Sequence, residues 1–388
     1  MSKNALKIAI VTGSRAEYGL FKPLLQAIKK DRSVQLQLLV TGMHLSPEFG
    51  LTYQQIESDG YKIDEKVEML LSADTDSAII KSTAIGMMGM ADALQRVQPD
   101  WIVLLGDRFE TFAAAFAAHQ AKIPVAHLHG GELTEGATDD AMRHAITKMS
   151  YLHFTSTEIY RKRVIQLGET PNRVINAGAI GLDAIRTLKP LSKKELEKQL
   201  GLQLGELNFL VTYHPVTLEK QTAAEQVTQM LKALDQFPEA QLIITMPNAD
   251  ADGRIIMKLL EEYSKKDTQR IHLFTSLGQL RYLSLLNHVQ LVIGNSSSGI
   301  IEVPEMKIPT INIGNRQEGR VRSKTVIDCG TSTANIIKAI KEALSVSFLR
   351  QCSKATNPYS KTGTADTILK SIRKTGKLVS IKKKFYDL

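Results

Sequence analysis

Charged side chains in this sequence gather in turns that follow apolar runs of strand length. Asp107 and Arg108 come directly after the run 101–105, in a Gly-Asp-Arg turn. An aspartate there can transfer protons or orient a reacting group, and an arginine can hold a phosphate through two parallel hydrogen bonds. The alternative for Asp107 is to cap the helix expected from Phe109. We interpret the two residues as functional.

A second set of ionisable residues follows the next predicted strand. The run HLHGGE (127–132) leads to Asp139 and Asp140, which open a predicted helix carrying Arg143 and His144. Two glycines let the backbone approach a ligand closely, and carboxylates in different environments can divide acid and base roles. Two other interpretations stay open. The histidines of the run could share a metal ion, although no third ligand is evident, and the aspartates could simply cap the helix.

The first predicted strand, 6–12, ends in the turn TGSRAEYG (12–19). Gly13 permits a tight turn and a helix N-terminus attracts anions, so Arg15 is a candidate phosphate contact. An ordinary surface arginine is the alternative. The second glycine of the GxGxxG motif is missing, which argues against a dinucleotide cofactor.

Polar turns also end strands in the second half of the chain. The turn GNSSSG (294–299) offers hydroxyls and free amides to an anion, although it could be a plain capped loop. It is not a Walker loop, and no GxSxG elbow supports a serine hydrolase. Glu302 could accept hydrogen bonds from two ribose hydroxyls. Arg316 and Arg320, after a further strand, are candidate contacts to a phosphate or a base.

The elements that must position these turns follow one pattern along the chain. Strand-length apolar runs alternate with segments of helical period, which predicts βαβ units and mostly parallel sheets. We therefore predict an α/β protein with two Rossmann-like, doubly wound domains that face each other across a ligand-binding cleft. The expected domains are 1–178 and 179–370, with a linker near 178–195 and with 371–388 packing back on the first. Long helices are expected at 77–97 and 188–204.

Composition narrows the class of protein. The 388 residues are 43% apolar and 23% charged, which suits two domains with buried cores. The net charge is +9, but aromatic residues make up only 6% and the one concentrated basic run is 382–384, so we favour a phosphorylated small ligand over nucleic acid. Two cysteines, Cys329 and Cys352, exclude a disulfide framework. No apolar run approaches the ~20 residues of a membrane helix and no signal peptide is evident, so we expect a cytoplasmic protein without a membrane partner.

Taken together, the motifs resemble those of the hydrolysing UDP-N-acetylglucosamine 2-epimerases of sialic acid synthesis, which are GT-B-fold epimerases. The combination of GNSSSGIIEVP with HGGE and GDRFE is specific. The matching stretches are VTGSRAEYG (11–19), VTGMH (40–44), LGDRFE (105–110), HGGE (129–132), DDAMRH (139–144), YHPVT (213–217), PNADADG (247–253), GNSSSGIIEVP (294–304) and INIGNRQEGR (311–320).

The resemblance implies a reaction. The substrate would be a UDP-2-acetamido sugar, and the products would be UDP and the free sugar inverted at carbon 2, which is N-acetylmannosamine in the sialic acid branch. The implied route is anti elimination of UDP to a 2-acetamidoglucal and then syn hydration, with no metal and no nicotinamide cofactor.

The resemblance also implies roles for residues. The acid/base candidates are Asp107, Glu132 and Asp139. The groups placed to meet charge on the departing diphosphate are Arg15, Arg108, His214, Ser296 and Ser297. On the nucleotide side, Glu302 would hold the ribose, Arg316 would lie near the uracil, and Asn248 and Asp250 would line the site. His44 and Arg320 fall in matching stretches and complete the substrate-binding candidates.

Two positions depart from related sequences. Some relatives have Glu where this chain has His129, so an acid/base role would pass here to His129, to Glu132 or to water. Non-hydrolysing relatives carry a lysine shortly after the first-turn arginine, where this chain has Leu20, with Lys22 nearby. The second departure favours the hydrolysing branch.

The substrate and the assembly stay open. We favour UDP-N-acetylglucosamine, and the alternative is UDP-N,N′-diacetylbacillosamine of the legionaminic acid branch, a 6-deoxy sugar that needs an apolar pocket wall. A UDP-sugar glycosyltransferase of the same architecture is the alternative from a different class. The apolar helix expected at 77–97 has more apolar surface than one sheet face needs, so we expect a homodimer or homotetramer.

Overall fold

The chain forms two compact units. The computed structural model describes residues 5–73, 75–134, 138–216, 222–247, 253–378 and 380–388. The first unit comprises Met1–Glu132, Asp139–Ala184 and Lys361–Leu388, and the second comprises Leu133–Thr138 and Ile185–Ser360. These divisions differ from the expected ones at 178 and 370. Two contacts account for the difference, because the Thr364 hydroxyl donates to the Ala177 carbonyl at 2.7 Å and the Asp183 carboxylate accepts from the Ala365 N–H at 2.8 Å.

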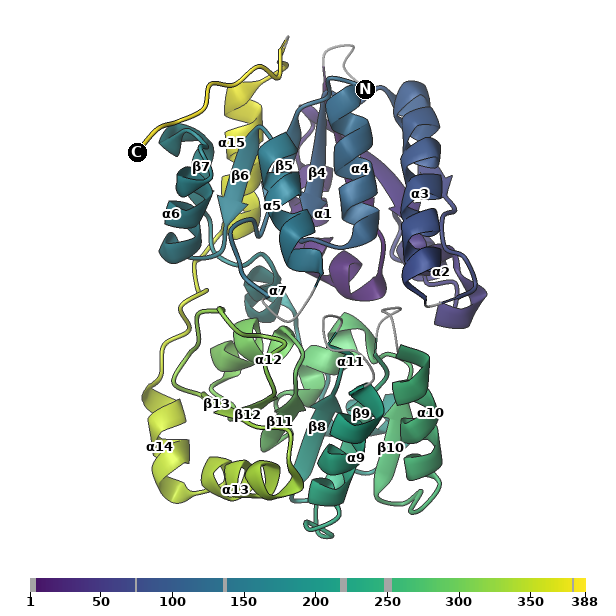
Figure 1. Ribbon diagram of the computed structural model, residues 1–388, viewed down its shortest axis with the longest axis vertical. Helices are drawn as coiled ribbons and strands as arrows, with labels where there is room; N and C mark the ends of the chain where they lie inside the picture. The colour runs from purple at the N-terminus through teal and green to yellow at the C-terminus, as the bar shows by residue number, and fades with distance from the viewer. Residues whose placement is uncertain (1–4, 74, 135–137, 217–221, 248–252, 379) are drawn as a thin grey trace. The chain divides into compact units, whose positions relative to one another are not determined.

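A seven-stranded sheet forms the centre of the first unit (Figure 1). Its order is β3-β2-β1-β4-β5-β6-β7, and all its strand pairs are parallel. The strands are β1 (Leu6–Thr12), β2 (Val34–Thr41), β3 (Glu65–Val67), β4 (Trp101–Leu105), β5 (Val125–Leu128), β6 (Leu152–Thr155) and β7 (Val174–Asn176). The order reverses between β1 and β4, where parallel α/β sheets bind ligands.

Helices cover both faces of this sheet. They are α1 (Arg15–Lys30), α2 (Tyr53–Ser58), α3 (Asp76–Val97), α4 (Phe109–Gln120), α5 (Asp139–Met149), α6 (Glu158–Gln166) and α15 (Thr364–Thr375), and α7 (Gly181–Thr187) runs across the division between the units. Alternate residues of β1 point to opposite faces. Ile8 and Ile10 share a core with α1 and α15, whereas Ala9 and Val11 share one with α3 and α4.

A six-stranded parallel sheet forms the centre of the second unit, in the order β10-β9-β8-β11-β12-β13. Its strands are β8 (Asn208–Thr212), β9 (Gln241–Thr245), β10 (Ile271–Phe274), β11 (Leu291–Gly294), β12 (Thr310–Ile313) and β13 (Val326–Cys329). Its helices are α8 (Lys193–Leu200), α9 (Ala223–Leu234), α10 (Gly253–Ser264), α11 (Gly278–Leu285), α12 (Ser298–Ile301), α13 (Thr333–Ala343) and α14 (Val346–Lys354). Here the order reverses between β8 and β11.

The long helix expected at 188–204 is wrong. Only α8 forms there, and it begins after Ser192, whose hydroxyl accepts from the Glu195 N–H while the Glu195 carboxylate accepts from the Ser192 N–H. This reciprocal cap fixes the start, and the left-handed Gly201 ends the helix. Within the described ranges, no helix is both long and apolar enough to span a lipid bilayer.

The C-terminal tail is attached to the first unit by a buried charge cluster. Lys383 Nζ lies 2.7 Å from one carboxylate oxygen of Glu169 and 2.8 Å from the other. Lys148 and His153 contact the same carboxylate at 2.7 and 3.0 Å. These contacts outweigh burial, which alone would raise the pKa of Glu169, and they lower it to about 2.

Candidate active site

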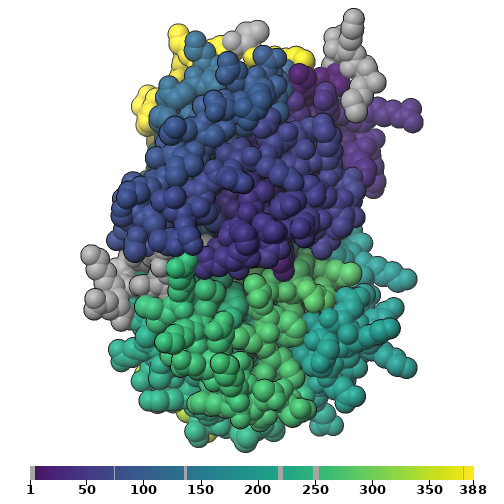
Figure 2. Space-filling view, turned by 90° about the vertical axis from the view of Figure 1, so that its right-hand side faces the viewer, coloured from purple at the N-terminus to yellow at the C-terminus, as the bar shows by residue number. Residues whose placement is uncertain are grey.

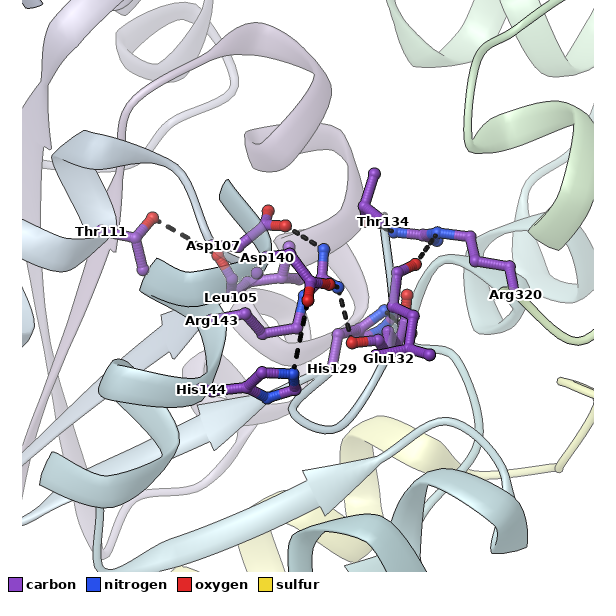
Figure 3. Close-up of polar contacts among 12 residues, drawn as sticks. Leu105, Asp107, Thr111, His129, Glu132, Thr134, Asp140, Arg143, His144 and Arg320 are labelled. Carbon is purple, nitrogen blue, oxygen red and sulfur yellow. Dashed lines mark hydrogen bonds and ion pairs between the residues drawn. The ribbon is translucent and has the colours of Figure 1, made fainter. Parts of the chain in front are cut away.

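Asp107 is held by a buried arginine. It follows β4 after Gly106, and its carboxylate contacts the guanidinium of Arg143, which projects from α5 (Figure 3). The same guanidinium donates to the Glu132 carbonyl at 2.7 Å and to the Asp140 carboxylate at 3.3 Å. Arg143 is 2% exposed, so its geometry is set by packing as well as by charge. The helix-capping alternative is not what forms, because the N-cap of α4 is Arg108 and no side chain caps it.

Glu132 and His129 form a second buried contact in the same unit. The Glu132 carboxylate accepts from the Ser156 hydroxyl at 2.6 Å and lies 3.0 Å from His129 Nδ1 (Figure 3). His129 has a φ of 65°, a left-handed conformation that is strained for a residue with a side chain. Its Nε2 is buried and has no hydrogen-bond partner among the described residues. Strain and an unused ring nitrogen are features that collect at functional sites.

The remaining acidic residues of α5 lie at its start. Asp139 is its first residue, and Asp140 also contacts His144 Nε2 at 3.5 Å. The described contacts therefore bring together Asp107, Glu132, His129 and Asp140 around Arg143. Arg143 was not selected as a site residue from the sequence, and its presence in the DDAMRH stretch was the one available signal.

Two further acidic side chains, Glu17 and Glu110, contact the turns that carry Arg15 and Arg108. Arg15 is the first residue of α1, and the Gly13 N–H donates to the Glu17 carboxylate at 2.6 Å. Arg108 Nε lies 3.2 Å from the Glu110 carboxylate, so this candidate phosphate contact has an acidic partner within the unit. Burial, reinforced by the charge of Glu110, raises the pKa of Glu17 to about 8, so Glu17 is protonated at neutral pH. Neither glutamate was selected from the sequence.

His44 supports this turn from within the core. It is fully buried, with Nε2 3.1 Å from the Thr12 hydroxyl and Nδ1 2.6 Å from the Thr52 hydroxyl. Burial lowers its pKa to about 4, so the ring is neutral at neutral pH. Because both ring nitrogens have hydrogen-bond partners, His44 stabilises the end of β1 and the turn that carries Arg15.

The second unit fixes a backbone segment instead of a carboxylate. Asn295 is fully buried, and its side chain accepts from the His214 N–H at 2.7 Å and donates to the His214 carbonyl at 2.8 Å. One amide therefore clamps both backbone groups of His214, which is separated from the end of β8 by the buried Tyr213. Gln317 Nε2 and Arg316 Nη1 donate to the Asn295 carbonyl at 2.8 and 3.2 Å.

The last residue of β11, where the chain enters the serine-rich turn, must be glycine. Gly294 has a φ of 139°, and a Cβ there would overlap the Thr212 carbonyl oxygen of the neighbouring strand. The turn continues through Ser296, whose hydroxyl accepts from the Ser298 N–H at 3.4 Å, and Ser297 precedes α12. Glu302 follows α12 and is buried.

Arg320 belongs to the same unit and contacts the segment that follows Glu132. Its Nε donates to the Leu133 carbonyl at 3.1 Å, and its Nη2 donates to the Thr134 hydroxyl at 3.3 Å (Figure 3). Two candidates from the sequence, Asn248 and Asp250, lie outside the described residues.

Comparison with known proteins gives consistent results. The family model described as UDP-N-acetylglucosamine 2-epimerase matches residues 26–373. The chain is 45% identical to the GDP/UDP-N,N′-diacetylbacillosamine 2-epimerase (hydrolyzing) of Campylobacter jejuni, over 84% of this chain and 85% of that protein. It is 37% identical to the polysialic acid biosynthesis protein P7 of Escherichia coli, over 98% of this chain and 97% of that protein.

The fold is also found among solved structures. The UDP-GlcNAc 2-epimerase of Neisseria meningitidis, solved with bound UDP-GlcNAc, superposes with a TM-score of 0.80 at 20% identity, covering 95% of this chain and all of that one. The expected pair of Rossmann-like parallel sheets is therefore confirmed.

Proposed function

Because the chain belongs to the UDP-N-acetylglucosamine 2-epimerase family, we propose that it is a hydrolysing epimerase that converts a UDP-2-acetamido sugar and water into UDP and the sugar inverted at carbon 2. The observation that carries the proposal is the buried Arg143, whose guanidinium contacts the side-chain carboxylate of Asp107 and donates to the backbone carbonyl of Glu132, and so joins two of the acid/base candidates. Positioned carboxylates are what proton removal beside a breaking glycosidic bond requires.

The proposed reaction has two steps. In the first, the bond from carbon 1 to the UDP oxygen breaks, a carboxylate takes the proton from carbon 2, and a 2-acetamidoglucal forms. In the second, water adds its hydroxyl to carbon 1 and a proton is delivered to carbon 2 on the same face as that hydroxyl, which is opposite to the face from which the first proton was removed. Asp107, Glu132 and Asp139 are the proposed proton carriers, and His129, whose Nδ1 faces Glu132, takes part in the return step.

We assign the nucleotide mainly to the second unit. His214 follows β8, and Ser296 and Ser297 follow β11, the two strands between which the order reverses. Arg316 follows the neighbouring strand β12, and Glu302 lies just beyond α12. Arg15 and Arg108 of the first unit remain candidates for the diphosphate. Hydroxyl, amide and guanidinium groups suit a diphosphate whose charge grows as it leaves.

The proposed sugar is N-acetylglucosamine, and a specific observation supports a second candidate. The 45% identical relative from Campylobacter jejuni is named for N,N′-diacetylbacillosamine and for GDP as well as UDP. Both sugars, and both nucleotides where the compound is available, belong in one side-by-side assay.

The test is incubation with UDP-N-acetylglucosamine in heavy water without any acceptor. We expect UDP and N-acetylmannosamine that carries deuterium at carbon 2. Asp107→Asn should abolish turnover and keep UDP affinity, because the amide preserves shape but cannot take the proton. Intact UDP-N-acetylglucosamine alone would contradict the proposed sugar, and intact substrate with both sugars would contradict the proposed reaction. Sugar transfer only with an added acceptor would indicate a glycosyltransferase.

We also propose that the chain forms a homodimer through α3, which covers the face of the first unit turned towards the viewer in Figure 2. Ile80 and Met88 on this helix are 69% and 72% exposed, and Ile85 of the same helix is also exposed. Phe116 is exposed on α4, which packs against α3. Large apolar side chains gathered on one face are typical of protein interfaces. Met88→Lys should convert a dimer to a monomer in analytical ultracentrifugation.

A further inference from the structure

His127 is a fully buried histidine in the middle of the candidate site that none of the proposed steps uses. It lies in β5, beside Leu104 of β4 and His153 of β6. Its Nε2 is 2.7 Å from the Gly106 carbonyl, and its Nδ1 is 3.1 Å from the Thr147 hydroxyl. A carbonyl only accepts, so the proton must be on Nε2, and Nδ1 must accept from Thr147.

These contacts define a neutral, fixed donor. Burial lowers the pKa of His127 to about 3, so the ring carries no charge at neutral pH. Thr147 is also fully buried, on α5. Gly130 leaves room for the arrangement, because a Cβ at this position would come within 2.9 Å of the Thr147 hydroxyl and 3.1 Å of His127 Nδ1.

The carbonyl that His127 holds belongs to the peptide plane between Gly106 and Asp107. On the other side of Gly106, its N–H donates to the Leu128 carbonyl at 3.0 Å. Both backbone polar groups of Gly106 are therefore fixed from β5. Gly106 has a φ of 76°, and a Cβ there would meet nothing within 4 Å, so glycine is favoured here by its backbone conformation and not by lack of space. The contacts from β5 hold the glycine in this one conformation.

We propose that His127 is a positioning residue for the reaction, which orients Asp107 by donating a hydrogen bond to the Gly106 carbonyl. This inference rests on the proposed function of Asp107. α5 then controls Asp107 by two routes from adjacent turns of one helix: Arg143 contacts its carboxylate, and Thr147 sets the tautomer of the histidine that orients its backbone. A displacement near 1 Å at a reacting group costs about 100-fold in rate.

The test compares four variants. His127→Phe removes the donor, and we expect kcat to fall about 100-fold while KM and the Kd for UDP stay within about threefold. His127→Gln keeps an amide donor and should recover at least about tenfold of that loss. Thr147→Val should lower kcat less than His127→Phe does. His119→Phe is the matched control, because His119 contacts the Met149 carbonyl at 3.3 Å at the other end of α4 and should leave kcat unchanged.

Each contrary outcome has a defined meaning. A wild-type kcat in His127→Phe overturns the proposal. The proposal is also overturned if His127→Gln is as inactive as His127→Phe and its pH–rate profile lacks one limb, because His127 would then carry protons itself. If His127→Phe does not fold, a wild-type kcat in Thr147→Val overturns it.

A readout without turnover separates this proposal from the proposed function. Imidazole ¹⁵N NMR of the whole protein should show His127 as the neutral Nε2–H tautomer from pH 5 to 8. A protonated ring or an Nδ1–H tautomer would contradict the positioning role. Failure of the wild-type chain to hydrolyse any UDP-sugar would contradict the proposed function and leave the NMR result to judge His127.

Discussion

The two units fix their key turns in different ways. In each unit the turn lies where the strand order reverses, and in each one buried side chain from another turn or helix organises it. In the first unit Arg143 contacts a carboxylate side chain, whereas in the second Asn295 clamps the backbone of His214. Placing charge suits proton transfer, and placing backbone groups suits recognition of a ligand. Under the proposed function, the first unit would therefore carry the chemistry and the second would carry the binding of the nucleotide.

Replacing Arg143 tests the proposed role of the first unit in the chemistry, and it has the largest expected effect of the substitutions compared below. In Arg143→Met the Asp107 carboxylate loses its buried partner, so we expect kcat to fall about 1,000-fold and stability to fall by about 3 kcal/mol. UDP affinity, measured by calorimetry, should stay within about threefold. Arg96→Met removes a two-pronged contact to Glu65 on the surface and is the matched control, with turnover unchanged. A wild-type kcat in Arg143→Met would show that the reaction does not depend on the contact between Arg143 and Asp107, and would contradict the role assigned to the first unit.

Replacing Asn295 tests the proposed role of the second unit in binding the nucleotide. Asn295→Leu leaves the His214 N–H and carbonyl without their buried partner, so we expect UDP affinity to fall about tenfold and stability to fall by about 2 kcal/mol. Asn208 is the matched control, because it makes similar contacts to Gly205 and to the His288 carbonyl at the other end of β8. Asn208→Leu should cost similar stability and leave UDP affinity unchanged. Equal losses of UDP affinity in both variants would show that Asn295 acts only through folding.

Replacing Glu169 tests whether a buried charge in the first unit can serve stability alone, and it has the smallest expected effect. Its low pKa means that it stabilises the fold above pH 4.5 and that this contribution is lost as the pH falls towards 2. Between pH 5 and 3, wild type should therefore lose more stability than Glu169→Gln, by about 1 kcal/mol after allowance for solvent screening. Urea unfolding measures this difference. Turnover at pH 7 should be unchanged in Glu169→Gln, and a large loss would show that buried charge in the first unit cannot be divided between chemistry and stability.

Much of the fold could be predicted from local pattern. The strands expected at 6–12 and 101–105 have the predicted bounds, because each is a short apolar run closed by a polar turn. The reciprocal cap at Ser192 could have corrected the long helix expected there, since its Ser-x-x-Glu pattern is visible in the sequence. The helix α14 was missed.

The candidate site was harder to predict in full. The turns were found because ionisable residues after buried strands are conspicuous. Arg143, Asn295 and His127 were not selected, because their roles depend on which turn each side chain reaches in three dimensions. An arginine or asparagine in a helix or a loop has an ordinary surface explanation until its partner is known.

Gly294 sets a limit for anyone who wishes to re-engineer this protein. Libraries that vary the proposed ligand contacts Ser296 and Ser297 should leave Gly294 unchanged, because any other amino acid at 294 would place a Cβ against the Thr212 carbonyl of β8. Randomisation of this loop is therefore best confined to the positions after Gly294.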